Sequence, residues 1–258
     1  MTPTIAAQPA AGYLNLFPEF AGTRRFTSAE YHQLIDSNIL GPDDHVELLD
    51  GYVRLKMDYV DPPPDGPFPE WRWLRRWSLG EYHRMIDLGI IDREEKLELL
   101  DGYVVLKMPQ NPPHRNATMR LLDCLLAHLP KGWVRLANST VETGLFEPEP
   151  DVVVVRGVMA DYEARNPVPA DFGIVIEVSD STLEGDRKRK SRLFAKLGLP
   201  VYWIVNLADR VIEVYTDPDA TANPPAYRTR TDYAPGDSVP ITLDGAAAGA
   251  IPVSELMP

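Results

Sequence analysis

The sequence predicts a mixed α/β fold in which a central sheet is flanked by helices. Two unbroken runs of mostly β-branched residues, at 151–155 and 173–178, have the composition of strands buried on both faces. A helix is expected at 116–129, where five leucines share one apolar face, and another at 187–197. Strands and helices therefore alternate along the chain, which favours one sheet with strands of mixed direction.

The N-terminal part of the chain contains an internal repeat. Residues 26–57 align without gaps on residues 77–108, at a constant offset of 51, and half of the 32 positions are identical. Each copy is predicted to form a helix, with Thr27 or Ser78 as its N-cap, followed by a hairpin that turns at an Asp-Gly pair. Only the second copy continues into the 116–129 helix, so we interpret it as the working copy and the first as an accessory.

These features predict four parts. Residues 1–25 are expected to be a flexible N-terminal segment, 26–60 the accessory copy, and 61–70 a proline-rich linker that can hold neither a helix nor a central strand. Residues 71–258 are expected to form the catalytic-type domain.

The remaining elements follow from local patterns. A strand is predicted at 133–141, and a hairpin is predicted from the runs 201–206 and 210–216. The 187–197 helix is expected to begin after Asp186 as its N-cap and to end at Gly198. The tail, 220–258, is rich in proline and alanine and is expected to add one or two edge strands.

Composition limits the function classes. The formal net charge of −12 argues against an extended basic surface, although it leaves room for a locally basic cleft. The single cysteine, Cys124, excludes an intramolecular disulfide. No apolar run approaches the roughly 20 residues that cross a bilayer, and no signal peptide is evident. We therefore expect a cytoplasmic protein that does not bind membranes.

Two carboxylates lie at the ends of the buried runs. Asp151 begins the first run and Glu177 lies near the end of the second. A buried carboxylate is costly to desolvate unless it is paired, hydrogen-bonded or bound to a cation. Two of them on strands that could be neighbours indicate a site for a hard divalent metal, although both could also cap strand ends through hydrogen bonds to loop amides.

A lysine completes this predicted site. Lys190 falls on the same helical stripe as Leu193, Phe194 and Leu197, so its ammonium group should meet a carboxylate, with Glu177 and Asp151 the nearest candidates. The alternative is that its ammonium group extends to water. Two carboxylates and a lysine are the apparatus of metal-dependent phosphodiester hydrolysis, in which Mg²⁺ (or Mn²⁺ in its place) polarises the phosphate and the amine orients the attacking water or stabilises negative charge.

Several motifs together carry a family resemblance. They are Pro150-Asp151, the run from Glu177 to Thr182, Asp186 with Lys190 and Phe194, and the run from Gly198 to Val205. From about residue 77 onward the chain resembles the Uma-type family of endonucleases, which belongs to the PD-(D/E)XK nuclease superfamily.

The resemblance implies a restriction endonuclease-like core, a divalent metal and DNA as the substrate. By motif position it implies Asp151, Glu177 and Val178 at the metal, Glu98 as a further active-site acid, and Lys190 as the catalytic lysine. One position departs from the superfamily pattern: Ser179 stands where that pattern has a lysine two residues after the acid.

Other residues are candidates for contacts with the substrate. His114 could contact substrate or serve the structure alone, and Arg187 and Lys188 could contact phosphate or form a solvated cluster. Glu47 occupies the position in the first copy that Glu98 has in the second. Trp71, Trp73 and Trp77, with neighbouring arginines, could stack on nucleic acid or pack the accessory copy against the core.

The first functional hypothesis is therefore a Mg²⁺-dependent DNA endonuclease. A second is a non-catalytic binding or scaffold module that keeps the fold, and a third is a metal-dependent hydrolase of another phosphoester. A homodimer is expected because cutting both strands of a duplex suits two-fold symmetry.

Overall fold

The structure, a computed structural model, describes residues 22–56, 74–107, 110–141 and 147–257. The chain divides into two compact units, residues 1–107 and 108–258. The expected linker at 61–70 and most of the expected N-terminal segment at 1–25 lie outside the described residues. Each unit is therefore described by itself.

The first unit contains both repeat copies, and each copy has a helix followed by an antiparallel hairpin. Thr27 and Ser78 each form a capping box with the glutamate three residues later. Both hairpins turn through an Asp-Gly pair with positive φ at both positions, as a type I′ turn requires. The first copy comprises α1 (Ser28–Asp36), the short 3₁₀ helix η2 (Pro42–Asp44), β1 (Val46–Leu49) and β2 (Tyr52–Leu55), and the second comprises α2 (Leu79–Asp87), β3 (Leu97–Leu100) and β4 (Tyr103–Leu106).

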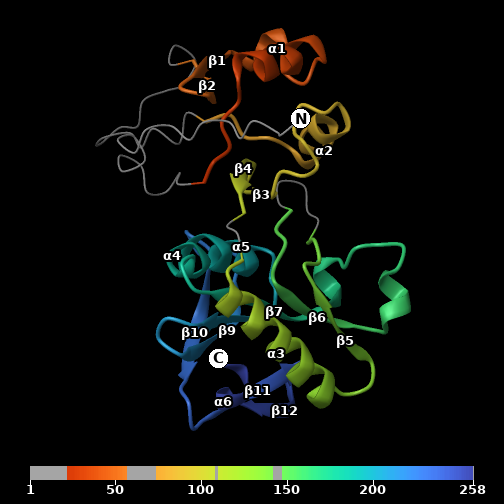
Figure 1. Ribbon diagram of the computed structural model, residues 1–258, viewed down its shortest axis with the longest axis vertical. Helices are drawn as coiled ribbons and strands as arrows, with labels where there is room; N and C mark the ends of the chain where they lie inside the picture. Colours follow the sequence, from red (N-terminus) through yellow and green to blue (C-terminus); the bar gives the residue numbers. More distant parts are fainter. Residues whose placement is uncertain (1–21, 57–73, 108–109, 142–146, 258) are drawn as a thin grey trace. The chain divides into compact units, whose positions relative to one another are not determined.

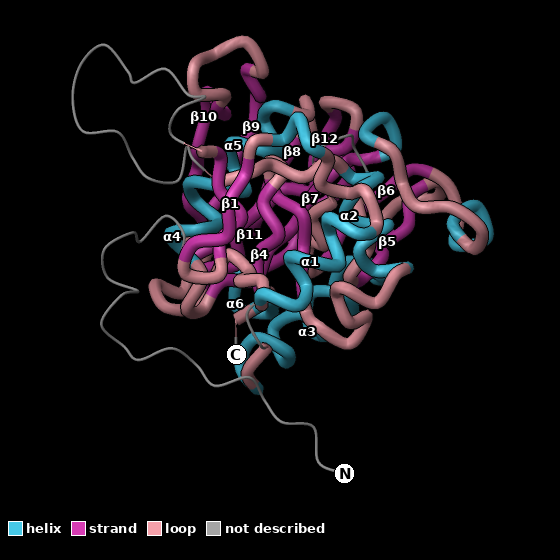
Figure 2. Tube along the Cα trace, turned by 90° about the horizontal axis from the view of Figure 1, so that it is seen from above, coloured by secondary structure: helices cyan, strands magenta, loops and turns pink. Residues whose placement is uncertain are grey.

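The second unit is built on a six-stranded mixed sheet, which confirms the predicted fold class. Its strand order is β10-β9-β8-β7-β6-β5, and Figure 2 shows the strands in that order from one side to the other. Only β7 and β8 pair in parallel; the other neighbours are antiparallel. The strands are β5 (Trp133–Ala137), β6 (Val152–Arg156), β7 (Phe172–Ser179), β8 (Val201–Asn206), β9 (Val211–Asp219) and β10 (Ala226–Tyr233).

One face of this sheet packs against helix α3, Pro112–His128 (Figure 1). Ala117, Leu121 and Leu125 of α3 are fully buried in a cluster with alternate side chains of β6, β7, β8 and β9. That alternation follows from the two-residue period of a strand. The same cluster includes residues of the hairpin β11 (Ser238–Leu243) and β12 (Ala246–Pro252) and of helix α6 (Val253–Leu256).

The opposite face of the sheet is covered by the helical segment between β7 and β8, since a parallel strand pair needs such a crossover. This segment comprises α4 (Leu183–Gly185), the π-helical η7 (Asp186–Lys190) and α5 (Ser191–Lys196). Phe194 packs edge-on against Tyr202 of β8, with ring centroids 5.0 Å apart. Tyr202 in turn lies 5.6 Å from the ring of Tyr215 and 6.2 Å from that of Tyr227.

Three sequence-based predictions need correction. The crossover helix begins at Leu183 after Thr182, so Asp186 lies inside the helix and is not its N-cap. The strand predicted at 133–141 ends at Ala137. The tail holds three strands, β10, β11 and β12, where one or two were expected. Strand β10 has few apolar positions and its place is set by pairing with β9, whereas β11 and β12 pair with each other, and neither partnership is revealed by local patterns.

The short 3₁₀ helices η5 (Met159–Tyr162) and η6 (Pro169–Asp171) occupy the connection from β6 to β7.

Strand β9 carries a fully buried carboxylate, Glu213. It accepts hydrogen bonds from Asn206 at 2.9 Å, Tyr215 at 2.7 Å and Arg187 at 2.5 Å. Burial acts to raise the pKa of Glu213, but these hydrogen bonds outweigh burial and the pKa is lowered.

Replacing Glu213 with alanine should lower the free energy of unfolding by about 2–4 kcal/mol at neutral pH, because its buried donors lose their acceptor. Since the folded-state pKa is lowered, the carboxylate's stabilisation is present above its unfolded-state pKa and is lost as the pH falls through the folded-state value. Urea unfolding across the acidic range measures both effects.

Asp209→Ala is the matched control. Asp209 also lies 3.6 Å from Arg187, but its side chain is 61% exposed, so we expect a loss within about 0.5 kcal/mol. An equal loss for the two variants would contradict the account of Glu213.

Candidate active site

Asp151 and Glu177 lie side by side at one end of two neighbouring strands. The antiparallel register of β6 and β7 sets Val152 opposite Ile176, so the residue before Val152 lies beside the residue after Ile176. Both carboxylates are buried, with 4% and 3% exposure. The strand register alone therefore brings together two residues that are 26 positions apart in the chain.

Asp151 is held by three hydrogen-bond donors. The main-chain N–H of Val178 donates to Oδ2 at 2.9 Å, and Nε2 of His114 lies 3.1 Å from the same oxygen. The side-chain amide of Gln110 donates to Oδ1 at 2.9 Å. Burial acts to raise the pKa of Asp151, but the hydrogen bond and charge of His114, the charge of Lys190 and the Val178 N–H outweigh it, and the pKa is lowered. Asp151 is therefore a carboxylate held in its charged form.

Glu177 has the opposite character. Its Oε1 accepts a hydrogen bond from Nζ of Lys190 at 2.8 Å. Burial raises the pKa of Glu177 well above its ordinary value; the charge of Lys190 opposes this, while the carboxylates of Asp151 and Asp186 add to it. When Asp151 and Glu177 are both charged, they place more negative charge in this buried space than the single ammonium group of Lys190 neutralises.

Lys190 comes from the π-helical segment η7 rather than from a regular α-helix. Short π-helical stretches inside α-helices are frequent at functional sites. Asp186, at the start of the segment, is buried and accepts hydrogen bonds from the hydroxyls of Ser179 and Thr182. Its other carboxylate oxygen lies 3.8 Å from the Lys190 amine. Ser179 thus ties β7 to the helix that supplies Lys190.

The structure brings five of the sequence-predicted site residues together: His114, Asp151, Glu177, Val178 and Lys190. Arg187 and Lys188 lie on the same helical segment. Arg187 pairs with Glu213, and Lys188 is 70% exposed and pairs with Glu184 at 2.7 Å.

Glu98 is buried on β3 of the first unit, and Glu47 lies at the equivalent position of β1. The role of Glu98 as a further active-site acid therefore stays a prediction. Trp71 and Trp73 lie outside the described residues. Trp77 is buried against Phe26, with ring centroids 5.6 Å apart, which favours packing over stacking on nucleic acid for this residue.

Sequence reasoning missed two residues of the site. The sequence predicts a capping role for Asp186, although its i, i+4 spacing to Lys190 also indicates a pair. Gln110 carries no such signal, because a lone polar residue in a loop has no periodicity. Its place follows from Asn111, which caps α3 by accepting from the His114 N–H and so fixes the turn that presents both Gln110 and His114 to Asp151.

The donor set suits a hard divalent cation with several water ligands. Across 22–56, 74–107, 110–141 and 147–257, no three His, Cys, Asp or Glu side chains form a cluster able to hold a metal by themselves. Two adjacent buried carboxylates with excess negative charge are what Mg²⁺, which keeps several waters, commonly binds. The Nδ1 atom of His114 is also buried without a hydrogen-bond partner, an unsatisfied polar atom at the same site.

Comparison with known proteins identifies the family of the chain and a related fold. Residues 79–248 match the model of the Uma2 family, described as "Putative restriction endonuclease". The chain belongs to this family. Its fold is similar to that of a putative nuclease belonging to DUF820 from Anabaena variabilis ATCC 29413, a crystal structure that is 14% identical, with a TM-score of 0.51 over 69% of this chain and 96% of that chain.

No curated protein matches the chain. Within the described residues, none of the helices combines the length and the apolar character that crossing a membrane requires. Family membership supports a nuclease function, which implies a nucleic acid as the substrate.

Replacing Glu177 with glutamine should raise the melting temperature of the metal-free protein at about pH 8. The raised pKa means that the charged carboxylate destabilises the folded state above its ordinary pKa, so a neutral isostere relieves that cost. Differential scanning calorimetry in the presence of a chelator measures the shift.

Glu184→Gln is the matched control, since this glutamate of the same region is 71% exposed and should leave the melting temperature nearly unchanged. A lower melting temperature for Glu177→Gln than for Glu184→Gln would contradict the electrostatic account of Glu177.

Proposed function

We propose that this protein is a metal-dependent DNA endonuclease that hydrolyses phosphodiester bonds. The observation that carries the proposal is the buried pair Asp151 and Glu177 with the Lys190 amine 2.8 Å from Glu177. Two carboxylates and an amine meet at the end of neighbouring strands in a chain of a restriction endonuclease family.

Asp151 and Glu177 would hold the cation, together with Val178 through its main-chain carbonyl. Mg²⁺ fits this oxygen set, and Mn²⁺ could take its place. When bound, the cation polarises the phosphate and lowers the pKa of a coordinated water. The lowered pKa of Asp151 supports its role, because a carboxylate already charged at neutral pH binds a cation without first losing a proton.

Lys190 would orient the attacking water and stabilise the negative charge that develops on the phosphate. Its amine is positioned by Glu177 and by Asp186, and the Asp186 main-chain carbonyl accepts a hydrogen bond from Tyr202. His114 would contact the substrate while its Nε2 holds Asp151. Glu98 is proposed as a further active-site acid from the family pattern.

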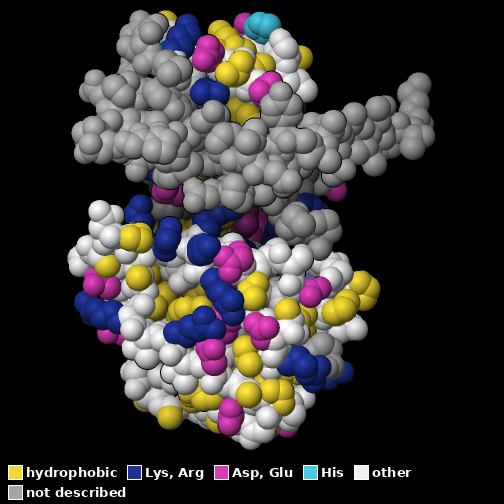
Figure 3. Space-filling view, turned by 90° about the vertical axis from the view of Figure 1, so that its left-hand side faces the viewer, with side chains coloured by type: hydrophobic (Ala, Val, Ile, Leu, Met, Phe, Trp, Pro, Cys, Tyr) yellow, Lys and Arg dark blue, Asp and Glu magenta, His cyan; other side chains and the backbone are white. Residues whose placement is uncertain are grey.

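A locally basic surface next to this site supports a nucleic-acid substrate. The crossover helix, 183–196, carries six basic and two acidic residues, against a chain that is acidic overall. Figure 3 shows Lys and Arg side chains gathered on the face of the second unit that carries α4, η7, α5 and β10. Phosphate contacts from such side chains supply affinity without sequence specificity. Arg187 and Lys188 are proposed to make such contacts.

Asp151→Ala and Lys190→Ala should each reduce Mg²⁺-dependent cleavage or nicking of plasmid DNA by about 10³-fold or more. The first variant removes a ligand of the cation and the second removes the ammonium group, so each loses positive charge that stabilises the reacting phosphate. Asp151→Ala should also abolish the heat of Mg²⁺ binding in calorimetry, whereas Lys190→Ala should retain binding.

Asp171→Asn is the matched control, because Asp171 comes directly before the first residue of β7, at the strand end away from Glu177, and pairs with Arg165. Its activity should equal that of the wild type. Cleavage that is unaffected by Asp151→Ala would refute the proposed site. A folded wild type with neither Mg²⁺ or Mn²⁺ binding nor cleavage would favour the non-catalytic binding module.

Lys188→Ala should weaken DNA binding without changing the cleavage rate at saturating DNA. Loss of one phosphate contact reduces the slope of log affinity against log salt by about one unit. Fluorescence anisotropy with a labelled duplex across a salt series, with Ca²⁺ in place of Mg²⁺, measures this slope. Lys131→Ala is the control, since Lys131 precedes β5 at the sheet end opposite Asp151; an equal effect of both variants would argue against a contact specific to Lys188.

A further inference from the structure

The two repeat copies of the first unit exchange main-chain hydrogen bonds reciprocally. The N–H of Arg24 donates to the carbonyl of Val104 at 2.8 Å, and the N–H of Arg75 donates to the carbonyl of Val53 at 2.9 Å. Arg24 and Arg75 are equivalent at the offset of 51, and so are Val53 and Val104. The segment before each helix therefore pairs with the hairpin of the other copy.

The same two arginines form reciprocal ion pairs. Each guanidinium is nearly buried and bridges the capping-box glutamate of its own copy and an acid of the other copy. Arg24 pairs with Glu30 and Glu95, each at 2.7 Å, and Arg75 pairs with Glu81 at 2.7 Å and Asp44 at 2.8 Å. Glu95 and Asp44 are again equivalent positions.

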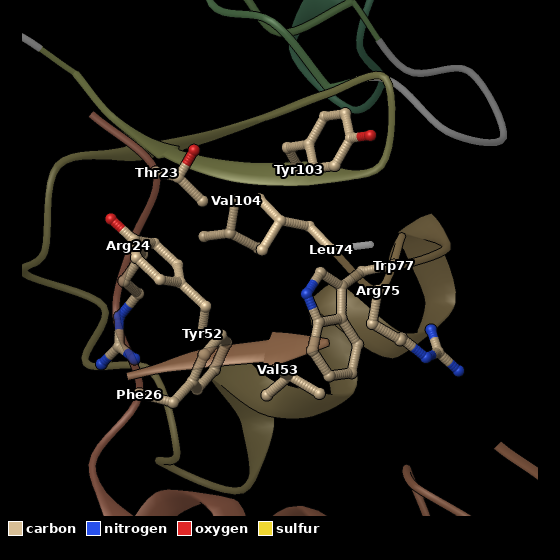
Figure 4. Close-up of a pocket in the computed structure, with 10 residues that line it drawn as sticks. All are labelled: Thr23, Arg24, Phe26, Tyr52, Val53, Leu74, Arg75, Trp77, Tyr103 and Val104. Atoms are coloured by element: carbon tan, nitrogen blue, oxygen red, sulfur yellow. The ribbon is translucent and has the colours of Figure 1, made fainter. Parts of the chain in front are cut away.

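The space between the copies has the same symmetry. The ten residues that line it form five equivalent pairs, among them Phe26 with Trp77 and Val53 with Val104. Figure 4 shows Val53, Val104 and Trp77 pointing into this space, with the side chains of Arg24 and Arg75 at opposite sides of it. One apolar cluster of buried residues includes members of both copies.

Such reciprocity is the pattern of an isologous interface, in which the same surface patch of two partners meets around a two-fold axis. The family match begins at residue 79, so the first copy lies outside it and the second copy lies almost wholly inside. The second copy therefore has a surface whose complement is another module of its own kind.

We propose that this surface, formed by Arg75, Trp77, Glu95 and β4, is a self-recognition surface, and that the first copy occupies it within the same chain. A second chain is then excluded from this surface, and each self-recognition pair belongs to a single chain with one second unit. At this surface we therefore expect an intramolecular pair of modules in place of the homodimer contact that the sequence analysis expects. The inference does not depend on the proposed function.

Two full-length charge-swapped variants test the proposal. Asp44→Arg with Glu95→Arg places arginines against Arg75 and Arg24, whereas Arg24→Glu with Arg75→Glu places glutamates against Glu95 and Asp44. In either chain alone, like charges oppose each other between the copies. When the two chains are mixed, each first copy meets a second copy of opposite charge, so we expect a one-to-one heterodimer of twice the 28.9 kDa chain mass by sedimentation or native mass spectrometry.

The wild type should stay monomeric at the same concentration, alone and mixed with either variant. A mixture that remains monomeric, with both variants folded by circular dichroism, would overturn the inference. A wild-type dimer that dissociates in both variants would also overturn it, because the first copy would then pair with another chain.

If either variant fails to fold, alanine pairs replace it. Asp44→Ala with Arg75→Ala, and Glu95→Ala with Arg24→Ala, should each show a melting-temperature loss in the double variant smaller than the sum of the two single losses, and similar for the two pairs. Additive losses in either pair would overturn the reciprocal contact on which the proposal stands.

Discussion

The burial of two carboxylates at one end of neighbouring strands is the constraint on which the second unit depends. Asp151 and Glu177 repel each other in a space from which water is largely excluded, and the hydrogen-bond donors around them reduce that cost. Three donors converge on Asp151, and the crossover helix carries Lys190 to Glu177. Replacing such a set with apolar residues would be expected to stabilise the fold, so its presence indicates a function that requires the charge.

Much of this arrangement is visible in the sequence, for a physical reason. The strands β7 and β8 are buried on both faces, and their continuous apolar runs identify them within a residue or two of their ends. Lys190 is identified by its stripe, because a helix that packs on a sheet keeps one face apolar and a cation on that face needs a partner.

Other parts could not be predicted, because their stability comes from partners distant in the chain. Strand β10 is largely exposed, and its place is set by pairing with β9. The crossover helix starts early because Asp186 is held by hydroxyls of Ser179 and Thr182, a contact that no local propensity encodes. The offset of the two repeat copies is plain in the sequence, whereas the exchange of their leading segments is a property of the folded unit alone.

The aromatic cluster between the crossover helix and the sheet affects where the Lys190 amine can lie. Lys190 lies on the crossover helix and Glu177 on β7, and the crossover helix also packs on the sheet through Phe194, whose ring contacts Tyr202 of β8, which in turn contacts Tyr215 of β9. Tyr227 extends this stack from the outermost strand and donates to the main chain of Leu199 at the end of the helix. A change of ring size in the stack would therefore shift the helix that carries Lys190 relative to the sheet, so the position of the amine can be tuned from residues that do not contact it.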